Sequence, residues 1–369
     1  MQIALTKKLA SAMKKKTVSS GCDVNSIFSW TANWTNTFDG RKEDMIVMVN
    51  NVTRFTVLIY GIKWNQFKDI ENKMINAIRN TLLAMNLNAE VVDEYMQKAG
   101  ELEFYSNSDR KLTAWINHQG LDAAFAAGRA ENESYGKMKF NDTLGHIVSR
   151  RPVNYSFKYE DSFIPADEMV KTLSELSGKP AYKYRAFEIF VTLDLETYKA
   201  IRRMIVPANI KFAELHKLMQ NVFDWKNCHL HDFKIIDDKT GETVERIVMS
   251  EEDLFYDEEA VLEEERELSE YFPKYKHMIY TYDFGDNWEH TIEFVKVIEE
   301  HNEDSPYLLE ATGQTPPEDV GGVDGFIEFR EVMLDQNHPD HAASKSWAGY
   351  WSPELSEWRT QPRRVYLYI

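Results

Sequence analysis

The sequence predicts an α+β protein of two domains, each a largely antiparallel or mixed sheet with packed helices. The length of 369 residues favours two hydrophobic cores rather than one. A hydrophobic content of 43% and an aromatic content of 13% are typical of globular structure. Strand and helix patterns mix without strict βαβ alternation and without a fixed repeat, which favours α+β over α/β architecture.

The first domain is expected to span residues 1–177. Its strands are predicted by β-rich runs, and the runs on either side of Asn50 and Asn51 form a hairpin. Its longest helix is predicted by apolar residues that recur every three or four positions from Trp64 to Met85. The predicted strands are 1–5, 27–34, 45–49, 55–62 and 103–105, and the predicted helices are 6–13, 64–85, 87–100, 109–127 and 165–176.

A break between the domains is predicted at Gly178, Lys179 and Pro180, because glycine and proline interrupt regular structure. The second domain then spans residues 181–369. It begins with an alternating strand at 184–193, followed by a helix that Asn209 could cap. Further elements are a strand at 229–236, a hairpin within 280–297, a helix at 326–334, and two short helices at 341–350 and from Pro353.

Composition excludes several functional classes. No apolar run is long enough to cross a bilayer, and Lys7 and Lys8 are not followed by the apolar core of a secretory signal. Cys22 and Cys228 belong to no Cys-x-x-Cys pair, so a reduced, cytoplasmic setting is expected.

The net charge of −17 argues against direct binding of nucleic acid, because a phosphate backbone would be repelled. Acidic residues are concentrated in an insertion at 251–272, where Arg266 alone opposes them. We expect this insertion to be a solvated or mobile surface segment, with parts that could be helical. A second hypothesis is that it mimics nucleic acid toward a basic partner.

The segment from Tyr280 to His290 has the highest concentration of polar and aromatic side chains suited to a functional site. Its turn-forming residues connect two aromatic strands. We expect one polar pocket formed by this hairpin tip, the strand that carries two histidines, and the acidic pair before a glycine pair. Its predicted members are His229, His231, Asp283, Asp286, Trp288, His290, Glu318 and Asp319.

Imidazole and carboxylate groups together suit Zn, Mn or Fe, so a divalent metal is a candidate cofactor, with His229, His231 and Asp283 as candidate ligands. His229 and His231 are placed on one strand face by their spacing, whereas Cys228 would face the opposite way. The alternative is structural: the histidines bond to carboxylates and backbone, and the aspartates shape a turn.

The second half resembles the plasmid pRiA4b ORF-three-like family, which includes transposon passenger proteins. The resemblance covers residues 181 to about 358, and the family usually has glycine where this chain has Asp224. The matching motifs are Arg202-Arg203 before Val206-Pro207, Leu215-His216, Phe223-Asp224-Trp225, residues 229–233, residues 282–290 and residues 316–322. The first half is similar to a separate uncharacterised domain family, through Thr6 to Leu9 and Asn50 to Thr53.

Neither resemblance implies an activity, so whether the protein is an enzyme is left open. The leading hypothesis is a non-enzymatic binding or adaptor protein from a plasmid or mobile-element setting, acting on an unknown protein partner. The alternatives are a metal-dependent hydrolase that uses the polar pocket and an acidic mimic of nucleic acid.

Overall fold

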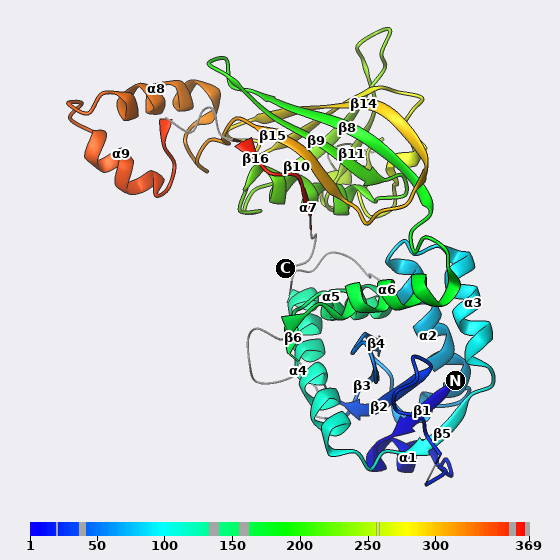
Figure 1. Cartoon of the computed structure of the whole chain (residues 1–369). Helices are drawn as coiled ribbons and strands as arrows, with labels where there is room; N and C mark the ends of the chain where they lie inside the picture. Colours follow the sequence, from blue (N-terminus) through cyan, green and yellow to red (C-terminus); the bar gives the residue numbers. More distant parts are fainter. Residues whose placement is uncertain are drawn as a thin grey trace. The chain divides into compact units, whose positions relative to one another are not determined.

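A computed structural model describes the chain except for residues 20, 37–41, 133–139, 155–161, 256, 258, 354–358 and 366–369. The chain divides into two compact units, Met1–Lys183 and Tyr184–Ile369 (Figure 1). Both units combine helices with mixed or antiparallel sheets, so the predicted α+β class is confirmed.

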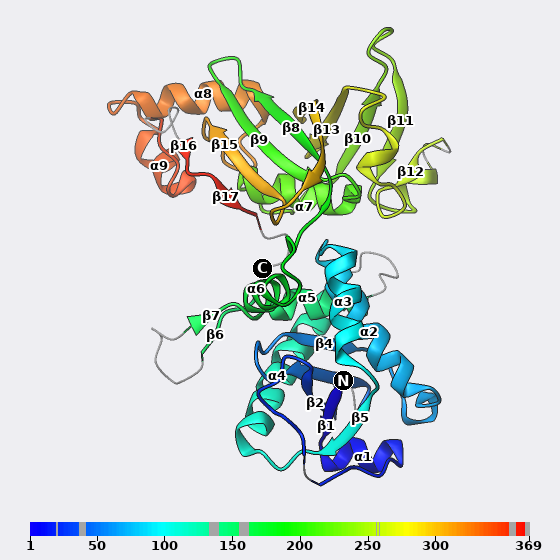
Figure 2. The same cartoon turned by 45° about the vertical axis from the view of Figure 1, so that its right-hand side comes forward.

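The first unit is built on a mixed sheet in the order β4-β3-β2-β1-β5. Strand β1 pairs in parallel with β2 and with β5, whereas β3 pairs antiparallel with β2 and β4. The strands are β1 (Gln2–Leu5), β2 (Ser29–Thr35), β3 (Met45–Asn50), β4 (Thr56–Ile59) and β5 (Glu103–Ser106). A separate two-stranded pair joins β6 (Val153–Asn154) to β7 (Ser162–Phe163), which is visible in Figure 2.

Helices cover this sheet because β3 is buried along its whole length, and a strand buried on both faces needs apolar partners on each side. On one face, Met45, Val47 and Leu58 pack with side chains of α4 and α5, among them Ile116 and Leu144. The helices of this unit are α1 (Lys7–Met13), α2 (Ile70–Ala84), α3 (Ala89–Ala99), α4 (Arg110–Asn132), α5 (Phe140–Ser149) and α6 (Pro165–Ser177).

The second unit contains a long sheet in the order β12-β11-β10-β13-β14-β8-β9-β15-β16, with β17 also paired to β15. All of these pairings are antiparallel except that of β11 with β12. The strands are β8 (Tyr184–Asp194), β9 (Lys199–Pro207), β10 (His231–Ile236), β11 (Thr243–Val248), β12 (Val261–Leu262), β13 (His277–Tyr282), β14 (Trp288–His301), β15 (Tyr307–Thr312), β16 (Arg359–Thr360) and β17 (Arg363–Arg364).

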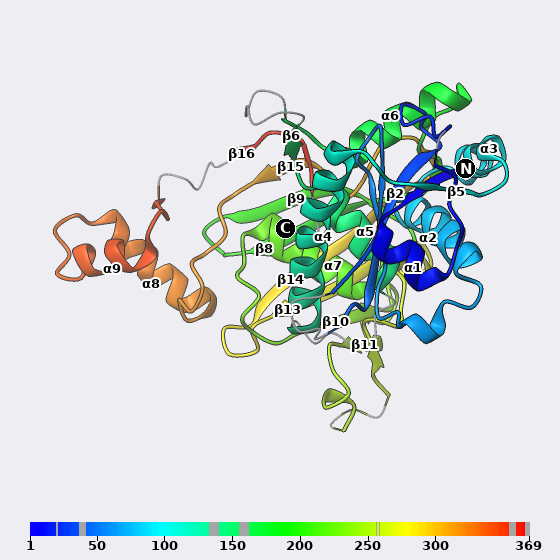
Figure 3. The same ribbon diagram turned by 90° about the horizontal axis from the view of Figure 1, so that it is seen from below.

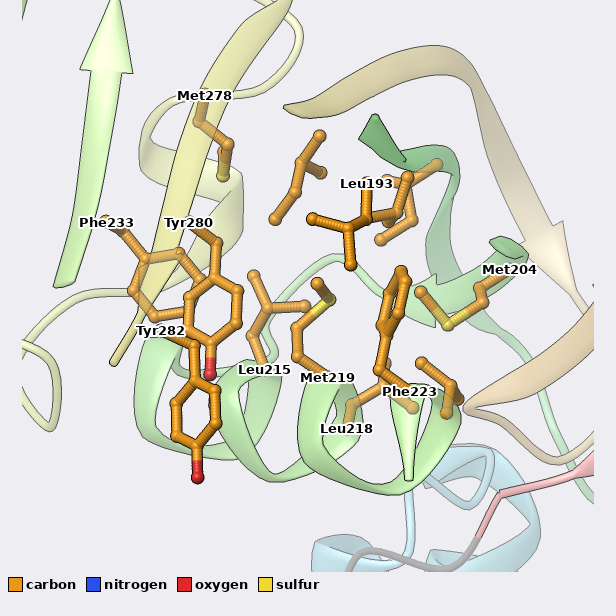
Figure 4. Close-up of a cluster of buried hydrophobic side chains, with 14 of the residues drawn as sticks. Leu193, Met204, Leu215, Leu218, Met219, Phe223, Phe233, Met278, Tyr280 and Tyr282 are labelled. Carbon is orange, nitrogen blue, oxygen red and sulfur yellow. The ribbon is translucent and has the colours of Figure 1, made fainter. Parts of the chain in front are cut away.

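Helix α7 (Phe212–Phe223) lies against this sheet and supplies much of its core. Figure 4 shows Leu215, Leu218 and Met219 of α7 in one cluster of buried side chains with Tyr280 and Tyr282 of β13. Helices α8 (Gly322–Leu334) and α9 (His341–Ala348) lie together at one end of the sheet (Figures 1 and 3). In the described part of the chain, no helix has the length and apolar character needed to cross a membrane.

A buried arginine fixes the end of α7 to the strands around it. The guanidinium of Arg202 on β9 donates to the carbonyl of Val222 at 2.6 Å and to the carbonyls of Thr312 and Gly313 at 3.0 and 3.1 Å. Gly313 has a positive φ, and a Cβ there would lie 2.5 Å from the carbonyl oxygen of Lys199, so only glycine fits this close approach. The loop that follows β15 therefore begins at a fixed place.

Several predicted boundaries are wrong. The helix expected at 64–85 is a short 3-10 helix at Trp64–Gln66 followed by α2, because Asp69 adopts a left-handed conformation that interrupts the helix. The strand expected at 229–236 begins only at His231. Helix α4 extends past the predicted end at 127, and most of the helix predicted from Pro353 lies outside the described residues.

The acidic insertion at 251–272 differs from the solvated segment that its composition suggests. Its described residues contain β12 and short 3-10 helices, and Leu268 and Phe272 enter the core. Glu263 is 2% exposed. The insertion is therefore packed on the second unit. Packing is possible because apolar residues lie among its acidic ones and enter the core.

We propose that the two units are separable domains that meet between Gly178 and Tyr184. Trypsin should cut after the exposed Lys183, whereas the Lys179–Pro180 bond should resist because proline follows the lysine. Mass spectrometry should find a fragment that begins at Tyr184. Residues 184–369 expressed alone should unfold cooperatively; a fragment without a cooperative transition would contradict the separation.

Candidate functional site

The loop between α7 and β10 is held by side chains that bind three consecutive backbone amides. The amide of Lys226 donates to Glu318 Oε1 at 2.6 Å, and that of Asn227 donates to Gln220 Oε1 at 2.8 Å. The amide of Cys228 donates to the hydroxyl of Tyr282 at 3.1 Å. The loop thus has a fixed path, although it is not part of the sheet.

Asp224 and Asn227 give this loop its sharp turns. Both have a positive φ, of 59° and 55°, and Asp224 is the residue that ends α7. Glycine adopts this conformation without strain, and Asp and Asn tolerate it better than other residues. Asp224 therefore meets the same backbone requirement as the glycine that is usual at this position.

A closed ring of hydrogen bonds lies under the loop. Because His216 Nε2 donates to Asn227 Oδ1 at 2.7 Å, its Nδ1 accepts from the Tyr280 hydroxyl at 2.8 Å. Gln220 Nε2 donates to the same hydroxyl at 2.9 Å. Gln220 also accepts from the Asn227 amide, which closes the ring and satisfies these buried groups.

The hairpin tip between β13 and β14 presents one oxygen of Asp283 away from the turn. Asp283 Oδ1 accepts from the amide of Gly285 at 2.9 Å and from that of Asp286 at 3.4 Å. The backbone amide of Asp283 is itself bound to the carbonyl of Leu230 at 2.9 Å. This leaves Oδ2, which lies 3.5 Å from His229 Nε2.

The loop between β15 and α8 brings Glu318 and Asp319 to the same place. Glu318 Oε1 accepts from Lys226 N and from the Tyr282 hydroxyl, at 2.6 and 3.2 Å. Its Oε2 lies 3.6 Å from His229 Nε2, and Asp319 Oδ1 lies 3.1 Å from the same nitrogen. Three carboxylates from two segments therefore converge on one imidazole. We call His229, Asp283, Glu318 and Asp319 the hairpin-tip site.

Two atoms of the hairpin-tip site are buried and lack a hydrogen-bond partner. They are His229 Nε2 and Glu318 Oε2, and Glu318 as a whole is 6% exposed. In the described part of the chain, His229 is the one basic side chain within 4 Å of the three carboxylates. A buried carboxylate without a compensating charge or hydrogen bond is costly, so the site is suited to a cation.

The geometry fits a metal ion. Ligands about 2.0–2.3 Å from a tetrahedral zinc ion lie roughly 3.3–3.8 Å apart, close to the separations found around His229 Nε2. Ligand atoms of His229, Asp283 and Asp319 lie within 4.8 Å of one another, and so do those of Cys228, His229 and Glu318. Such a site could hold a metal or bind a cationic group.

The other predicted pocket residues lie elsewhere. Asp286 accepts from the amide of Gly321 at 3.1 Å and so ties the hairpin to the start of α8. Trp288 is fully buried beside Trp225. His290 is in the core, where its Nε2 accepts from the Trp225 indole at 3.3 Å and its Nδ1 donates to the carbonyl of Trp288 at 3.0 Å.

His231 belongs to a different cluster, so the expectation that it shares a strand face with His229 is wrong. Its ring stacks on His216 at 3.5 Å between centroids, and its Nε2 lies 2.9 Å from Glu263 Oε2. Burial lowers the pKa of His231 to about 4 and that of His216 to about 3, and it raises the pKa of Glu263 to about 7. The strand begins after His229, so the alternation rule does not apply to both.

Sequence reasoning missed Cys228 and Tyr282. Strand alternation predicts that Cys228 faces away from His229, but residues 228–230 precede the strand. The ring of Tyr282 is buried. Its hydroxyl nevertheless reaches Cys228 and Glu318, and a tyrosine at a strand end beside a hairpin tip was the available signal.

Comparisons with known proteins match the two halves of the chain separately. The family model described as plasmid pRiA4b ORF-3-like protein matches residues 185–359, and the model of a domain of unknown function, DUF6933, matches residues 2–168. The uncharacterized protein y4hQ of Sinorhizobium fredii is 35% identical over 159 residues, which are 43% of this chain and 78% of that protein.

A solved structure is also similar. The crystal structure of a protein of unknown function, MM3350 from Methanosarcina mazei Go1, is 30% identical and has a TM-score of 0.41. The similarity covers 48% of this chain and 100% of that chain.

Buried His290 should make the second unit sensitive to acid. Burial holds its pKa near 3, below the ordinary 6.5, so the unfolded chain takes up the proton first as pH falls below 6.5. The free energy of unfolding should therefore decrease between pH 6.5 and 3, by about 2 kcal/mol at pH 5 from this group. The free energy of unfolding of His290→Gln, measured with urea at pH 7 and at pH 5, should decrease between the two pH values by less than that of the unaltered protein. The difference should be about 2 kcal/mol.

The matched control is His338→Gln, because the His338 side chain is 38% exposed. This variant should lose as much stability between pH 7 and pH 5 as the unaltered protein. An identical loss in His290→Gln would show that the His290 proton is not coupled to folding.

Proposed function

The chain belongs to the plasmid pRiA4b ORF-3-like family, and we propose that its second unit is a non-enzymatic binding module that takes up a divalent metal ion at the hairpin-tip site. The observation that carries the proposal is the unsatisfied pair of buried atoms, His229 Nε2 and Glu318 Oε2. They lie 3.6 Å apart.

Charge supports a cation as the ligand. The hairpin-tip site contains three carboxylates and one imidazole, and a divalent ion would neutralise most of the excess negative charge. Ligands that combine imidazole nitrogen and carboxylate oxygen favour Zn, Mn or Fe over Mg or Ca. Of the candidate ligands inferred from the sequence, His229 and Asp283 enter this proposal, whereas His231 does not.

The binding partner of the loaded module is proposed to be a protein. Leu230 and Phe284 are 53% and 43% exposed, and the backbone of Leu230 pairs with Asp283. Apolar side chains beside a charged site are suited to a protein surface, whereas the net charge of −17 disfavours direct contact with nucleic acid. An adaptor in a plasmid or mobile-element setting would have these properties.

Metal uptake is tested by titrating metal-free protein with Zn²⁺ and Mn²⁺ in a calorimeter. We expect one ion per chain to bind, and Glu318→Gln to weaken binding by about 100-fold or more, because the substitution removes a charged ligand. The matched control is Glu299→Gln, which alters an exposed carboxylate paired with Arg185. The affinity of Glu299→Gln for either metal should equal that of the unaltered protein. Absence of heat with either metal in the unaltered protein would overturn the proposal.

A metal-dependent hydrolase is the second candidate. Asp319 is 68% exposed at its side chain, so solvent reaches the hairpin-tip site, and catalytic zinc sites keep one position for water. If the site is catalytic, zinc-loaded protein should hydrolyse activated carboxylic or phosphate esters, and Glu318→Gln should abolish the rate. Metal binding without turnover would leave the binding module as the function.

A further inference from the structure

We propose that Cys228 is a thiolate ligand of the metal at the hairpin-tip site and makes the site selective for zinc over manganese. This inference rests on the proposed function. It adds a residue that sequence reasoning excluded and names the class of metal.

The position of Cys228 supports the assignment. Its Sγ lies within 4.8 Å of ligand atoms of both His229 and Glu318. The same Glu318 carboxylate contains the buried oxygen without a hydrogen-bond partner, Oε2. Cys228 forms no disulfide and is exposed, and its Sγ lies 3.9 Å from the Tyr282 hydroxyl, a weak contact that a metal ion could replace.

Tyr282 places two of these ligands relative to each other. Its hydroxyl accepts from the Cys228 amide at 3.1 Å and donates to Glu318 Oε1 at 3.2 Å. The other Glu318 oxygen, Oε2, is the one that lies 3.6 Å from His229 Nε2. Tyr282 is therefore a positioning residue: it fixes the loop that carries the thiol and leaves Oε2 for the metal.

Two overlapping ligand sets share His229. One set contains Cys228 and Glu318, and the other contains Asp283 and Asp319. Manganese prefers oxygen ligands, whereas zinc binds thiolate and imidazole strongly. The set that includes the thiolate therefore makes the site selective for zinc. Asp319 is exposed, so it is the ligand most easily replaced by water.

Coordination of the thiol releases one proton. The S–H bond of Cys228 breaks, a sulfur–zinc bond forms, and the proton passes to solvent. No electron is transferred, so the step needs no oxidant. Zinc affinity should accordingly rise with pH in the unaltered protein, and it should rise less steeply when Cys228 is replaced.

Cobalt(II) provides a direct test, because thiolate coordination gives an intense near-ultraviolet charge-transfer band that oxygen and nitrogen ligands do not give. Full-length protein loaded with cobalt(II) should show this band, and Cys228→Ser should lose it. The matched control is Cys22→Ser, since the chain has two cysteines and Cys22 lies in the first unit. Cys228→Ser should also weaken zinc binding by about 10–100-fold and manganese binding much less.

A second measurement needs no variant. Zinc should protect Cys228 from alkylation by iodoacetamide, as followed by peptide mass spectrometry, and should leave the rate at Cys22 unchanged. Cobalt binding without the charge-transfer band, or equal alkylation of Cys228 with and without zinc, would overturn the role of Cys228 and leave the proposed function intact. Failure of the unaltered protein to bind zinc or cobalt at all would overturn the proposed function instead.

Discussion

The carboxylate of Glu318 is the group on which the organisation of the second unit's loops depends. It is buried, and one of its oxygens joins the loop after α7 to the end of β13 through Lys226 and Tyr282. A charge in this position is stable only if its oxygens are satisfied or neutralised. The same carboxylate therefore holds three segments together. Its other oxygen, Oε2, is buried without a hydrogen-bond partner, and this oxygen defines the site.

Two polar networks connect those segments to the rest of the second unit. Arg202 binds backbone carbonyls at the end of α7 and at the start of the loop that leads to Glu318. The ring formed by Tyr280, His216, Asn227 and Gln220 holds the loop that carries His229. Asp283 and Asp319 add left-handed backbone turns at the site itself, and such turns persist where surrounding contacts fix them. Side chains held in this way can meet a ligand with little reorganisation.

The acidic insertion shows that composition and environment are separate properties. The acidic residues of the insertion contribute to the low pI of the chain, which is about 5.1. One of them, Glu263, is nevertheless buried against His231 and has a raised pKa. Arg246 pairs with Asp232 and Asp257, which ties the insertion to β10 and β11. The insertion is thus a packed part of the unit. The acidic residues that do not face the core form its charged surface.

The sequence by itself determined the fold class and the hairpin of β13 and β14. Those depend on alternation, helical spacing and turn-forming residues, which act over a few neighbours. It also singled out His229, Asp283, Glu318 and Asp319 by residue type. Only the tertiary structure decided that these four meet, because β10 lies beside β13 and the loop before α8 returns to the same end of these two strands. It also separated His231 from them and added Cys228, because the strand begins at His231 and the preceding residues follow no strand alternation. A strand boundary is set by long-range pairing, which local periodicity does not encode.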